Sequence, residues 1–357
     1  MRIKQITTTN VRIPYAAPVG PYIGRRSVGG HGTLGAGGLI VKIETDTGII
    51  GWGEGTGKFE TNPNTILAAH RVANIEGALA AMELAGINKG PMSGIEMALW
   101  DALGKHAELP VYQLFGGQVR DEVDFCACMG LKEPTESAKT AREYIDRWGF
   151  RFLKTKAGDD SDDDLQIAEA IQGEVGNDAV LRPDANNGYS PEEAKSVLQR
   201  MKDLGVRYFE DPCSSEHLDA LVHFRMEIGM GILVNMGVGT PDTVLTLLAN
   251  EGVDIIMPDT PAAGGMIRVK KVAAVAEAYN TPCLMHCSHD LGLKTAAITH
   301  IAASTPNFSG PNDTCYHGLT DDILAEPLRF KNGKIRVPSN PGLGVDVDEA
   351  KIEKYSV

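Results

Sequence analysis

The chain has no apolar run long enough to cross a membrane. None of its uninterrupted apolar stretches approaches the roughly 18 to 20 residues that a membrane-spanning helix needs. Residues 1–9 alternate apolar and polar side chains, as a strand does, and lack the apolar core and cleavage site of a secretion signal. We therefore expect no membrane partner and a cytoplasmic location.

Basic residues are few. The 357 residues include 34 Lys plus Arg against 47 Asp plus Glu, which gives a net charge of −13, and the basic residues form no run. A protein that binds a phosphate backbone needs a basic surface to displace counterions. We therefore expect no nucleic acid partner.

Cysteines are sparse, and none belongs to a C-x-x-C motif. This spacing argues against a disulfide framework and against a structural zinc site. We expect buried thiols at most of the six positions, which are Cys126, Cys128, Cys213, Cys283, Cys287 and Cys315.

The first 120 residues have the pattern of a small α+β domain. Residues 1–55 contain alternating apolar segments, including 39–44 and 49–53, separated by Gly-rich turns, which predicts an antiparallel meander. Residues 65–84 and 93–103 place apolar side chains at steps of three and four, which predicts helices.

From residue 123 the pattern changes to short apolar runs that alternate with amphipathic stretches. Seven such units predict an α/β fold with a (β/α) barrel over residues 121–328. An open doubly wound sheet is the alternative, but no glycine-rich phosphate fingerprint follows any of these runs. Residues 329–357 return to strand and turn signals, and we expect this tail to pack against the N-terminal domain. The expected barrel strands are 123–128, 150–156, 179–184, 207–210, 232–236, 254–259 and 282–286.

Ionisable residues fall at the ends of these strands. Several follow one another at 26 to 28 residues, which is about one β/α repeat. All strands of a barrel open their C-terminal ends onto one mouth, so these side chains should converge there. The residues are Lys154, Lys156, Asp184, Glu210, Asp259 and His286.

Lys154 and Lys156 have period-two spacing, which directs both side chains to one face of a strand. Two adjacent cations lower each other's pKa, and desolvation lowers it further, so one lysine could become a usable base. The alternative is a pair of solvated lysines at a strand end.

Asp184 and Glu210 would supply hard oxygen ligands from successive strands, which suits Mg²⁺. Either acid alone could instead cap the next helix. Asp259 and His286 end consecutive strands, and a carboxylate beside an imidazole raises its basicity and makes it a general acid or base. His289 is a competing candidate for that role.

These motifs, taken in order, resemble the enolase superfamily, in particular its mandelate racemase/muconate lactonizing enzyme branch, over nearly the whole chain. The similar features are Gly51-Trp-Gly-Glu54, Ile95-Glu-Met-Ala-Leu-Trp-Asp101, Leu114-Phe-Gly-Gly117, the Lys-x-Lys at 154 and 156, Asp184-Ala-Asn186, Glu210-Asp-Pro212, Pro258-Asp259, Gly264-Gly265 and Pro341-Gly-Leu-Gly344.

The resemblance implies a capping domain that seals a modified TIM barrel, (β/α)₇β, in which one Mg²⁺ holds a substrate carboxylate. Such enzymes remove the proton α to that carboxylate and stabilise the enediolate on the metal. By the same resemblance Lys156 is the base on one face, with Lys154 next to the carboxylate. His286, oriented by Asp259, serves the opposite face.

The resemblance also implies substrate contacts and an oligomer. The segment from Tyr15 to Gly30, which includes Tyr22, would be the loop that contacts the distal part of the substrate. Asn186 and Asp313 are further candidate substrate residues, with Asp313 near the end of the eighth strand. Members of this family commonly form dimers or octamers, so we expect a homo-oligomer.

The sequence departs from the family at the fifth strand, where a third metal-binding acid is expected. Residues 231–240 contain no acid, and Asn235 stands nearest to that place. The amide oxygen of Asn235 could bind the metal, or Asp211 or water could substitute. Each solution makes the site less anionic and weakens Mg²⁺ binding.

We therefore expect an enzyme that abstracts an α-proton from a small carboxylate substrate. Racemisation or epimerisation and β-elimination of water both remain open, with an acid sugar, a hydroxyproline-like amino acid or a lactone precursor as substrate. Alternatives are a cycloisomerase of the same family, a barrel enzyme that needs no metal, and an impaired barrel that acts as a binding protein.

Overall fold

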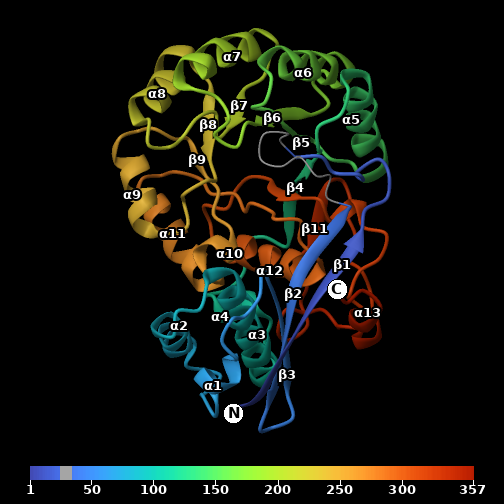
Figure 1. Ribbon diagram of the computed structural model, residues 1–357, viewed down its shortest axis with the longest axis vertical. Coiled ribbons are helices and arrows are strands. Elements are labelled where there is room, and N and C mark those ends of the chain that lie inside the picture. Colours follow the sequence, from blue (N-terminus) through green and yellow to red (C-terminus); the bar gives the residue numbers. More distant parts are fainter. Residues whose placement is uncertain (25–33) are drawn as a thin grey trace.

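The computed structural model describes residues 1–24 and 34–357. The chain begins with an antiparallel sheet in the order β1-β2-β3, which lies apart from the barrel in Figure 1. Four helices follow it. The elements of this cap are β1 (Ile3–Pro14), β2 (Gly35–Thr45), β3 (Ile50–Gly55), α1 (Pro63–Leu67), α2 (Ile75–Leu84), α3 (Lys89–Ala107) and α4 (Val111–Leu114).

Alternate glycines on β3 explain how the cap packs. A Cβ atom on Gly51 would lie 2.1 Å from the carbonyl oxygen of Ala98, and one on Gly53 would lie 2.0 Å from that of Gly94. Because these positions have no side chain, α3 packs directly on the backbone of β3. The expected continuous helix over residues 65–84 is wrong, because the chain leaves the helix after α1 and Ala69 adopts a left-handed φ of 56°.

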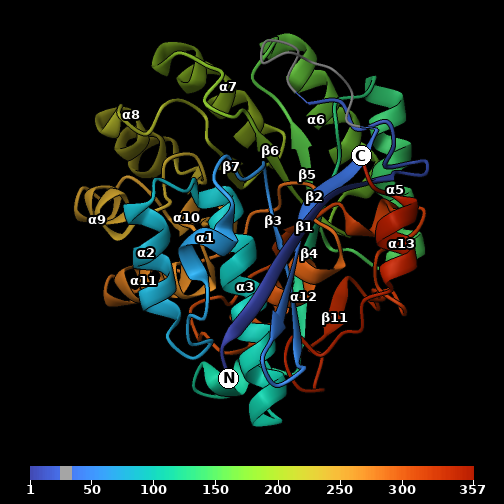
Figure 2. The same cartoon turned by 60° about the horizontal axis from the view of Figure 1, so that its bottom comes forward.

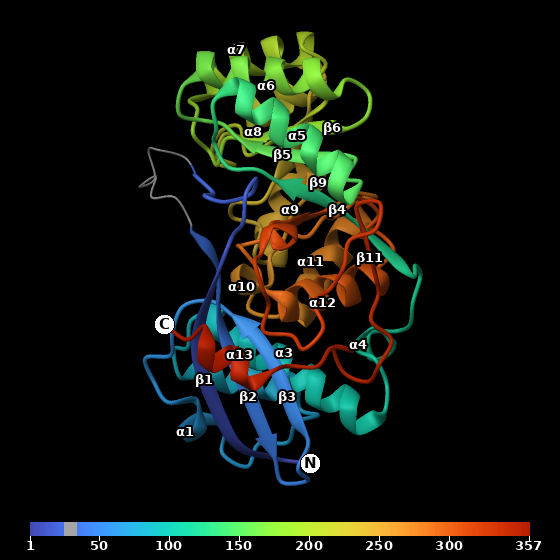
Figure 3. The same ribbon diagram turned by 90° about the vertical axis from the view of Figure 1, so that its right-hand side faces the viewer.

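The barrel strands form a parallel sheet in the order β10-β4-β5-β6-β7-β8-β9. The expected barrel is thus confirmed, with helices on its outer side (Figures 1 and 3). Its strands are β4 (Glu122–Cys128), β5 (Phe152–Lys156), β6 (Val180–Asp184), β7 (Tyr208–Glu210), β8 (Gly231–Val234), β9 (Ile255–Ile256) and β10 (Asn312–Thr314). Its helices are α5 (Pro134–Trp148), α6 (Ser161–Val175), α7 (Pro191–Asp203), α8 (Leu218–His223), the π-helix η2 (Phe224–Ile228), α9 (Pro241–Ala249), α10 (Thr260–Ala263), α11 (Met266–Ala278), α12 (Gly292–Ala303) and the 3₁₀ turn η3 (Tyr316–Gly318).

The expected seventh strand, 282–286, is reduced to a single parallel bridge between Ile256 and Cys283. Pro282 lacks the N–H group that a ladder needs at that position. The ring still closes, because the Asp313 N–H donates to the Met285 carbonyl at 2.9 Å and β10 pairs with β4.

Two buried carboxylates of the cap fasten it to the barrel. Glu54 on β3 accepts the backbone N–H groups of Leu291 and Lys294 at the start of α12, at 2.7 and 2.8 Å. Glu96 on α3 accepts those of Met266 and Ile267 at the start of α11, at 2.8 and 3.0 Å. The N-terminus of a helix offers unpaired N–H groups and a positive dipole end, so an acid is suited to each position.

The tail contacts both the barrel and the cap. Its strand β11 (Lys334–Arg336) pairs antiparallel with β4, and its helix α13 (Glu349–Lys354) lies beside β1 in Figure 2. Lys42 of β2 binds Glu349 of α13 at 2.7 Å, and Val11 of β1 bridges to Ser356. Within the described ranges, 1–24 and 34–357, no helix combines the length and the apolar character needed to span a bilayer.

Candidate active site

The six strand-end residues expected to converge do meet at the C-terminal mouth of the barrel. Neighbouring strands bring them together: β5 pairs Lys156 with Asp184 of β6, which in turn pairs with Glu210 of β7. Asp259 follows β9, and its side chain contacts that of His286. Ligand atoms of His286 and Glu210 lie within 4.8 Å of each other, which joins the two groups.

Lys154 lies at the centre of a cage of carboxylates. Its Nζ lies 3.0 Å from Asp184 Oδ2, 2.7 Å from Glu210 Oε1 and 2.9 Å from Asp313 Oδ2, and the side chain is buried. Burial alone would lower the pKa of Lys154, but Asp184, Asp313 and Glu210 raise it well above its usual value. The expectation that neighbouring cations would lower its pKa is therefore wrong for Lys154, which stays charged.

Arg182 completes this cage and was not predicted. It forms ion pairs with Asp313 and, through Nε at 3.1 Å, with Glu210 Oε2. Arg182 precedes Asp184 by two residues and so shares its face of β6, which is a signal the sequence did contain. Asp313, expected near the substrate, is fully buried and is held by Lys154 and Arg182.

Lys156 and Asn186 lie at the rim of the cage. Lys156 Nζ donates to Asp184 Oδ2 at 2.7 Å and to Asn186 Oδ1 at 2.9 Å. Burial alone would raise the pKa of Asp184, but the charges of Lys154 and Lys156 hold it far below its usual value. The Lys156 side chain is 12% exposed, so it reaches the mouth where Lys154 does not.

His286 pairs with Asp259 at the mouth of the barrel. His286 Nδ1 lies 3.3 Å from Asp259 Oδ2, which also accepts the Ser288 hydroxyl at 2.5 Å. Lys294 Nζ, buried on α12, lies 2.6 Å from Asp259 Oδ1. Burial alone would raise the pKa of Asp259, but Lys294 and His286 hold it far below its usual value. The carboxylate is therefore permanently charged beside the imidazole.

His289, the competing imidazole, has different partners. Its Nδ1 pairs with the Tyr15 hydroxyl at 2.9 Å, and its ring meets Tyr22 edge to face at 4.6 Å. Burial, followed by the charge of Lys156, lowers the pKa of His289 to about 4. Its contacts thus differ from the carboxylate pairing of His286. Of the expected substrate loop, residues 25–33 lie outside the described part of the chain, and Tyr22 is buried against His289.

Three carboxylates could hold a divalent cation. Ligand oxygens of Asp184, Glu210 and Asp211 all lie within 4.8 Å of one another, and all three residues are buried. Glu210 Oε2 is buried and receives no aligned hydrogen bond, although Arg182 lies close to it. Hard carboxylate oxygens are the ligands that Mg²⁺ prefers, so the residues present fit such an ion.

Asn235 stands at the end of β8, where the third acid was expected. Its Nδ2 donates to the Met257 carbonyl at 2.8 Å, and its backbone N–H donates to Asp211 Oδ1 at 3.0 Å. Asp211 also accepts the Met236 N–H at 3.2 Å, and its φ of 43° is left-handed. The strained turn after Glu210 thus places Asp211 as the third acid of the cluster. Metal binding by Asn235 stays a prediction.

Two family models match this chain. Residues 136–351 match "Enolase C-terminal domain-like", and residues 31–116 match "Mandelate racemase / muconate lactonizing enzyme, N-terminal domain". The larger match alone spans more than half of the chain.

Characterised relatives include different activities at similar identity. The chain is 28% identical to the L-Ala-D/L-Glu epimerase of Bacillus subtilis over 97% of both chains. It is 29% identical to the D-galactarolactone cycloisomerase of Agrobacterium fabrum, over 89% of this chain and 90% of that relative. A crystal structure of a putative sugar isomerase from Streptomyces coelicolor superimposes with a TM-score of 0.89 at 28% identity, over 99% of this chain and 96% of the other.

Proposed function

Since the chain belongs to the enolase superfamily, in its mandelate racemase/muconate lactonizing enzyme branch, we propose that it abstracts the proton α to a substrate carboxylate and then reprotonates that carbon. The product would be the opposite stereoisomer of a small carboxylic acid. Racemases and epimerases are among the relatives, as are dehydratases and cycloisomerases.

The observation that supports this proposal best is a difference in exposure. The side chains of Lys156 and His286 are 12% and 17% exposed, whereas those of Lys154, Asp184 and Glu210 are 2% exposed or less. A general acid or base must come within hydrogen-bonding distance of the proton that it transfers. Lys156 and His286 are therefore suited to meet a substrate from two sides of the mouth.

In this proposal Lys156 Nζ takes the α-proton on one face, and the Asn186 side chain orients the amine. On the opposite face the His286 Nδ1–H group donates a hydrogen bond to Asp259. The other ring nitrogen, Nε2, is then free to exchange a proton with the substrate. Asp259 also stabilises the imidazolium that forms, because Lys294 and Ser288 keep its carboxylate in place.

Asp184, Glu210 and Asp211, with Asn235 nearby, would hold the divalent cation. Such an ion supplies positive charge to the substrate carboxylate as the carbon acid ionises. Lys154 and Arg182 keep the buried acids Glu210 and Asp313 in fixed positions. The cage therefore orients the ligands before substrate arrives.

β-Elimination of water is the second candidate. The His286–Asp259 pair could protonate a leaving hydroxyl group instead of the α-carbon, and dehydratases acting on sugar acids are among the relatives. An acid sugar or a hydroxyproline-like amino acid with a β-hydroxyl group would be the substrate.

The test is α-proton exchange in D₂O, followed by NMR over a panel of hydroxy acids, acid sugars and proline derivatives with Mg²⁺ present. We expect Lys156→Ala and His286→Ala each to abolish exchange from one face while the other face continues. Full wild-type exchange in both variants would contradict the assignment of bases.

The same protein samples distinguish the alternative functions, a binding protein and an enzyme that needs no metal. Undetectable Mg²⁺ binding by calorimetry, with and without carboxylates, together with no exchange on any compound would favour a binding protein. Exchange that survives exhaustive chelation would favour a barrel enzyme that needs no metal.

A further inference from the structure

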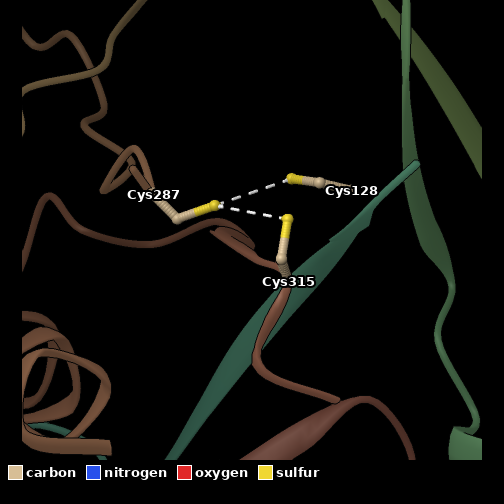
Figure 4. A group of neighbouring side chains, drawn as sticks. All are labelled: Cys128, Cys287 and Cys315. Carbon is tan, nitrogen blue, oxygen red and sulfur yellow. Dashed lines mark hydrogen bonds between the residues drawn. The ribbon is translucent and has the colours of Figure 1, made fainter. Parts of the chain in front are cut away.

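Three buried thiols from distant parts of the chain meet beside the candidate active site. Cys128 ends β4, Cys287 follows His286, and Cys315 follows β10. Cys287 Sγ lies 3.9 Å from Cys128 Sγ and 4.0 Å from Cys315 Sγ, and the three sulfur atoms all lie within 4.8 Å of one another. Figure 4 shows the three side chains pointing toward a common centre.

The arrangement fits a single soft cation. Three sulfur atoms placed about 2.3 Å from a central ion in one plane are about 4 Å apart, which matches these separations. Among the residues that the structure describes, no histidine or carboxylate joins the three thiols as a fourth ligand. Zinc prefers four ligands, whereas Cu(I) is soft and is satisfied by three thiolates.

The surroundings favour a thiolate at Cys128, and the thiolate is the form that binds a metal. Burial alone would raise the pKa of Cys128, but contacts from Cys287 and Cys315 and the charges of Lys154 and Arg182 bring it well below its usual value. Cys128 is paired with Lys154 between β4 and β5. Contacts with Cys128, together with burial, raise the pKa of Cys287 and Cys315 instead, so a bound ion must displace their protons. The thiolate of Cys128 has positive charge nearby.

Access is compatible with a small ion. Cys128 and Cys315 are 2% exposed, and Cys287 is 8% exposed, so Cys287 is the thiol through which an ion would enter. Tyr15 lies near the trio, since its pKa is raised first by burial and then by the neighbouring cysteines. Such a shielded position excludes bulky thiol reagents better than it excludes a bare ion.

We propose that Cys128, Cys287 and Cys315 form a trigonal binding site for Cu(I), separate from the carboxylate site that would hold Mg²⁺. Binding replaces the remaining thiol protons, which pass to the buffer, and the ion keeps its oxidation state. The proposal is independent of the reaction proposed above, because none of the three cysteines takes part in that reaction.

The test is anaerobic titration of the full-length protein with Cu(I) in competition with bathocuproine disulfonate. We expect one Cu(I) per chain, a thiolate-to-copper absorption band in the ultraviolet, and an X-ray absorption spectrum with three sulfur ligands at about 2.3 Å. Complete transfer of copper to the chelator would overturn the proposal. A ligand shell dominated by nitrogen or oxygen would overturn it as well.

Variants locate the site. Cys128→Ser, Cys287→Ser and Cys315→Ser should each weaken Cu(I) binding at least about 100-fold, since each removes a direct ligand. Cys126→Ser is the matched control, because Cys126 is also buried on β4 but lies outside the trio. The Cu(I) affinity of this variant should stay at the wild-type value. Equal affinity in all four variants would contradict the site. The X-ray absorption of the wild type tests the proposal even if a variant fails to fold.

Discussion

Asp259 connects the imidazole of the candidate site to the barrel framework. Its carboxylate accepts a hydrogen bond from Ser288 and contacts both His286 and Lys294. Lys294 also forms an ion pair with Asp290 at 2.7 Å. A buried carboxylate with these partners remains ionised, and it fixes the orientation of the imidazole ring. The orientation of the His286 ring therefore depends on Asp259.

We expect Asp259→Asn to lower proton exchange at the His286 face by about 10- to 100-fold, because an amide neither stabilises the imidazolium nor fixes its tautomer as a carboxylate does. Exchange at the Lys156 face should change little. NMR in D₂O with each stereoisomer as substrate separates the two faces.

Asp290→Asn is the matched control for this variant. It removes the negative charge of Asp290, which pairs with the same lysine, Lys294. The contact between Asp259 and His286 stays in place. Asp259→Asn could lower proton exchange equally on both faces, or Asp290→Asn could lower it by the same amount. Either result would mean that Asp259 affects exchange only through the stability of the folded protein.

Asn235 lies next to Asp211 of the candidate metal site and adds no charge there. We expect Asn235→Asp to tighten Mg²⁺ binding about tenfold, since it adds an anionic oxygen where ligand charge sets affinity. The new carboxylate would be repelled by the Met257 carbonyl, to which the amide now donates, and would be free to bind the cation. Calorimetry measures the change.

The control for that measurement is Asn280→Asp, which adds the same charge at an exposed position. It should leave the affinity for Mg²⁺ within a factor of about two, because exposed charges at a distance are screened by salt. No tightening in Asn235→Asp would place the third ligand elsewhere, with Asp211 as the remaining acid of the cluster.

Strand ends are where the sequence was most informative. Period-two spacing and the β/α repeat predicted that Lys154, Lys156, Asp184 and Glu210 would converge, because a parallel barrel exposes the same edge of every strand. The same rule cannot predict which side chain is buried. Lys154 and Lys156 have the same strand face, yet Lys154 is enclosed by acids from β7 and β10 that only the folded ring brings close.

Contacts made by helices and turns were much less predictable. Lys294 lies on α12, eight residues after His286, and no periodic pattern relates it to Asp259. The cysteine trio unites positions 128, 287 and 315, so the absence of a short cysteine motif revealed nothing about it. Strand β9 also spans only Ile255–Ile256 of the predicted 254–259, because Pro258 lacks the N–H group that would continue the ladder.

Helix α12 has a histidine whose protonation state is fixed by the backbone. His300 Nδ1 accepts the Tyr112 N–H at 3.2 Å, and its Nε2 lies 3.0 Å from the Leu343 carbonyl, to which it donates. Burial lowers the pKa of His300 to about 4 from the ordinary 6.5. The neutral ring thus links the cap, the barrel and the tail.

We expect this residue to make the protein less stable as the pH falls from about 6.5 to 4. The unfolded chain binds a proton in this window and the folded chain does not, so acid favours unfolding. Each pKa unit corresponds to about 1.4 kcal/mol, so the loss from His300 approaches ~3 kcal/mol at pH 4. Urea unfolding of the wild type and of His300→Gln over this range measures it.

His300→Gln should be less stable than the wild type at pH 7 but should lose less stability on acidification. His289→Gln should show a similar reduction, since burial lowers the pKa of His289 as well. Parallel pH profiles for the wild type and His300→Gln would contradict the assignment of a neutral His300.

The cap, the barrel and the tail form one interlocked molecule. Chain segments from both ends complete the cap, and β11 of the tail adds to barrel strand β4. Asp101 of α3 accepts the Trp52 N–H of β3 at 2.8 Å and the Leu343 N–H of the tail at 2.8 Å. The cap, the barrel and the tail are thus held in position by shared buried contacts.

We expect the whole chain to unfold in a single transition that depends on Glu54 and Glu96. Truncation of either acid to Ala leaves two buried backbone N–H groups at a barrel helix without a partner, and should lower the free energy of unfolding by about 2 to 5 kcal/mol. Glu76→Ala is the control, because its ion pair with Lys271 also joins the cap to the barrel but is exposed, and should cost less than ~1 kcal/mol. Calorimetry of Glu54→Ala/Glu96→Ala should resolve two transitions, as the cap loses both anchors to α11 and α12. One unchanged transition in this double variant would mean that apolar contacts alone couple the cap to the barrel.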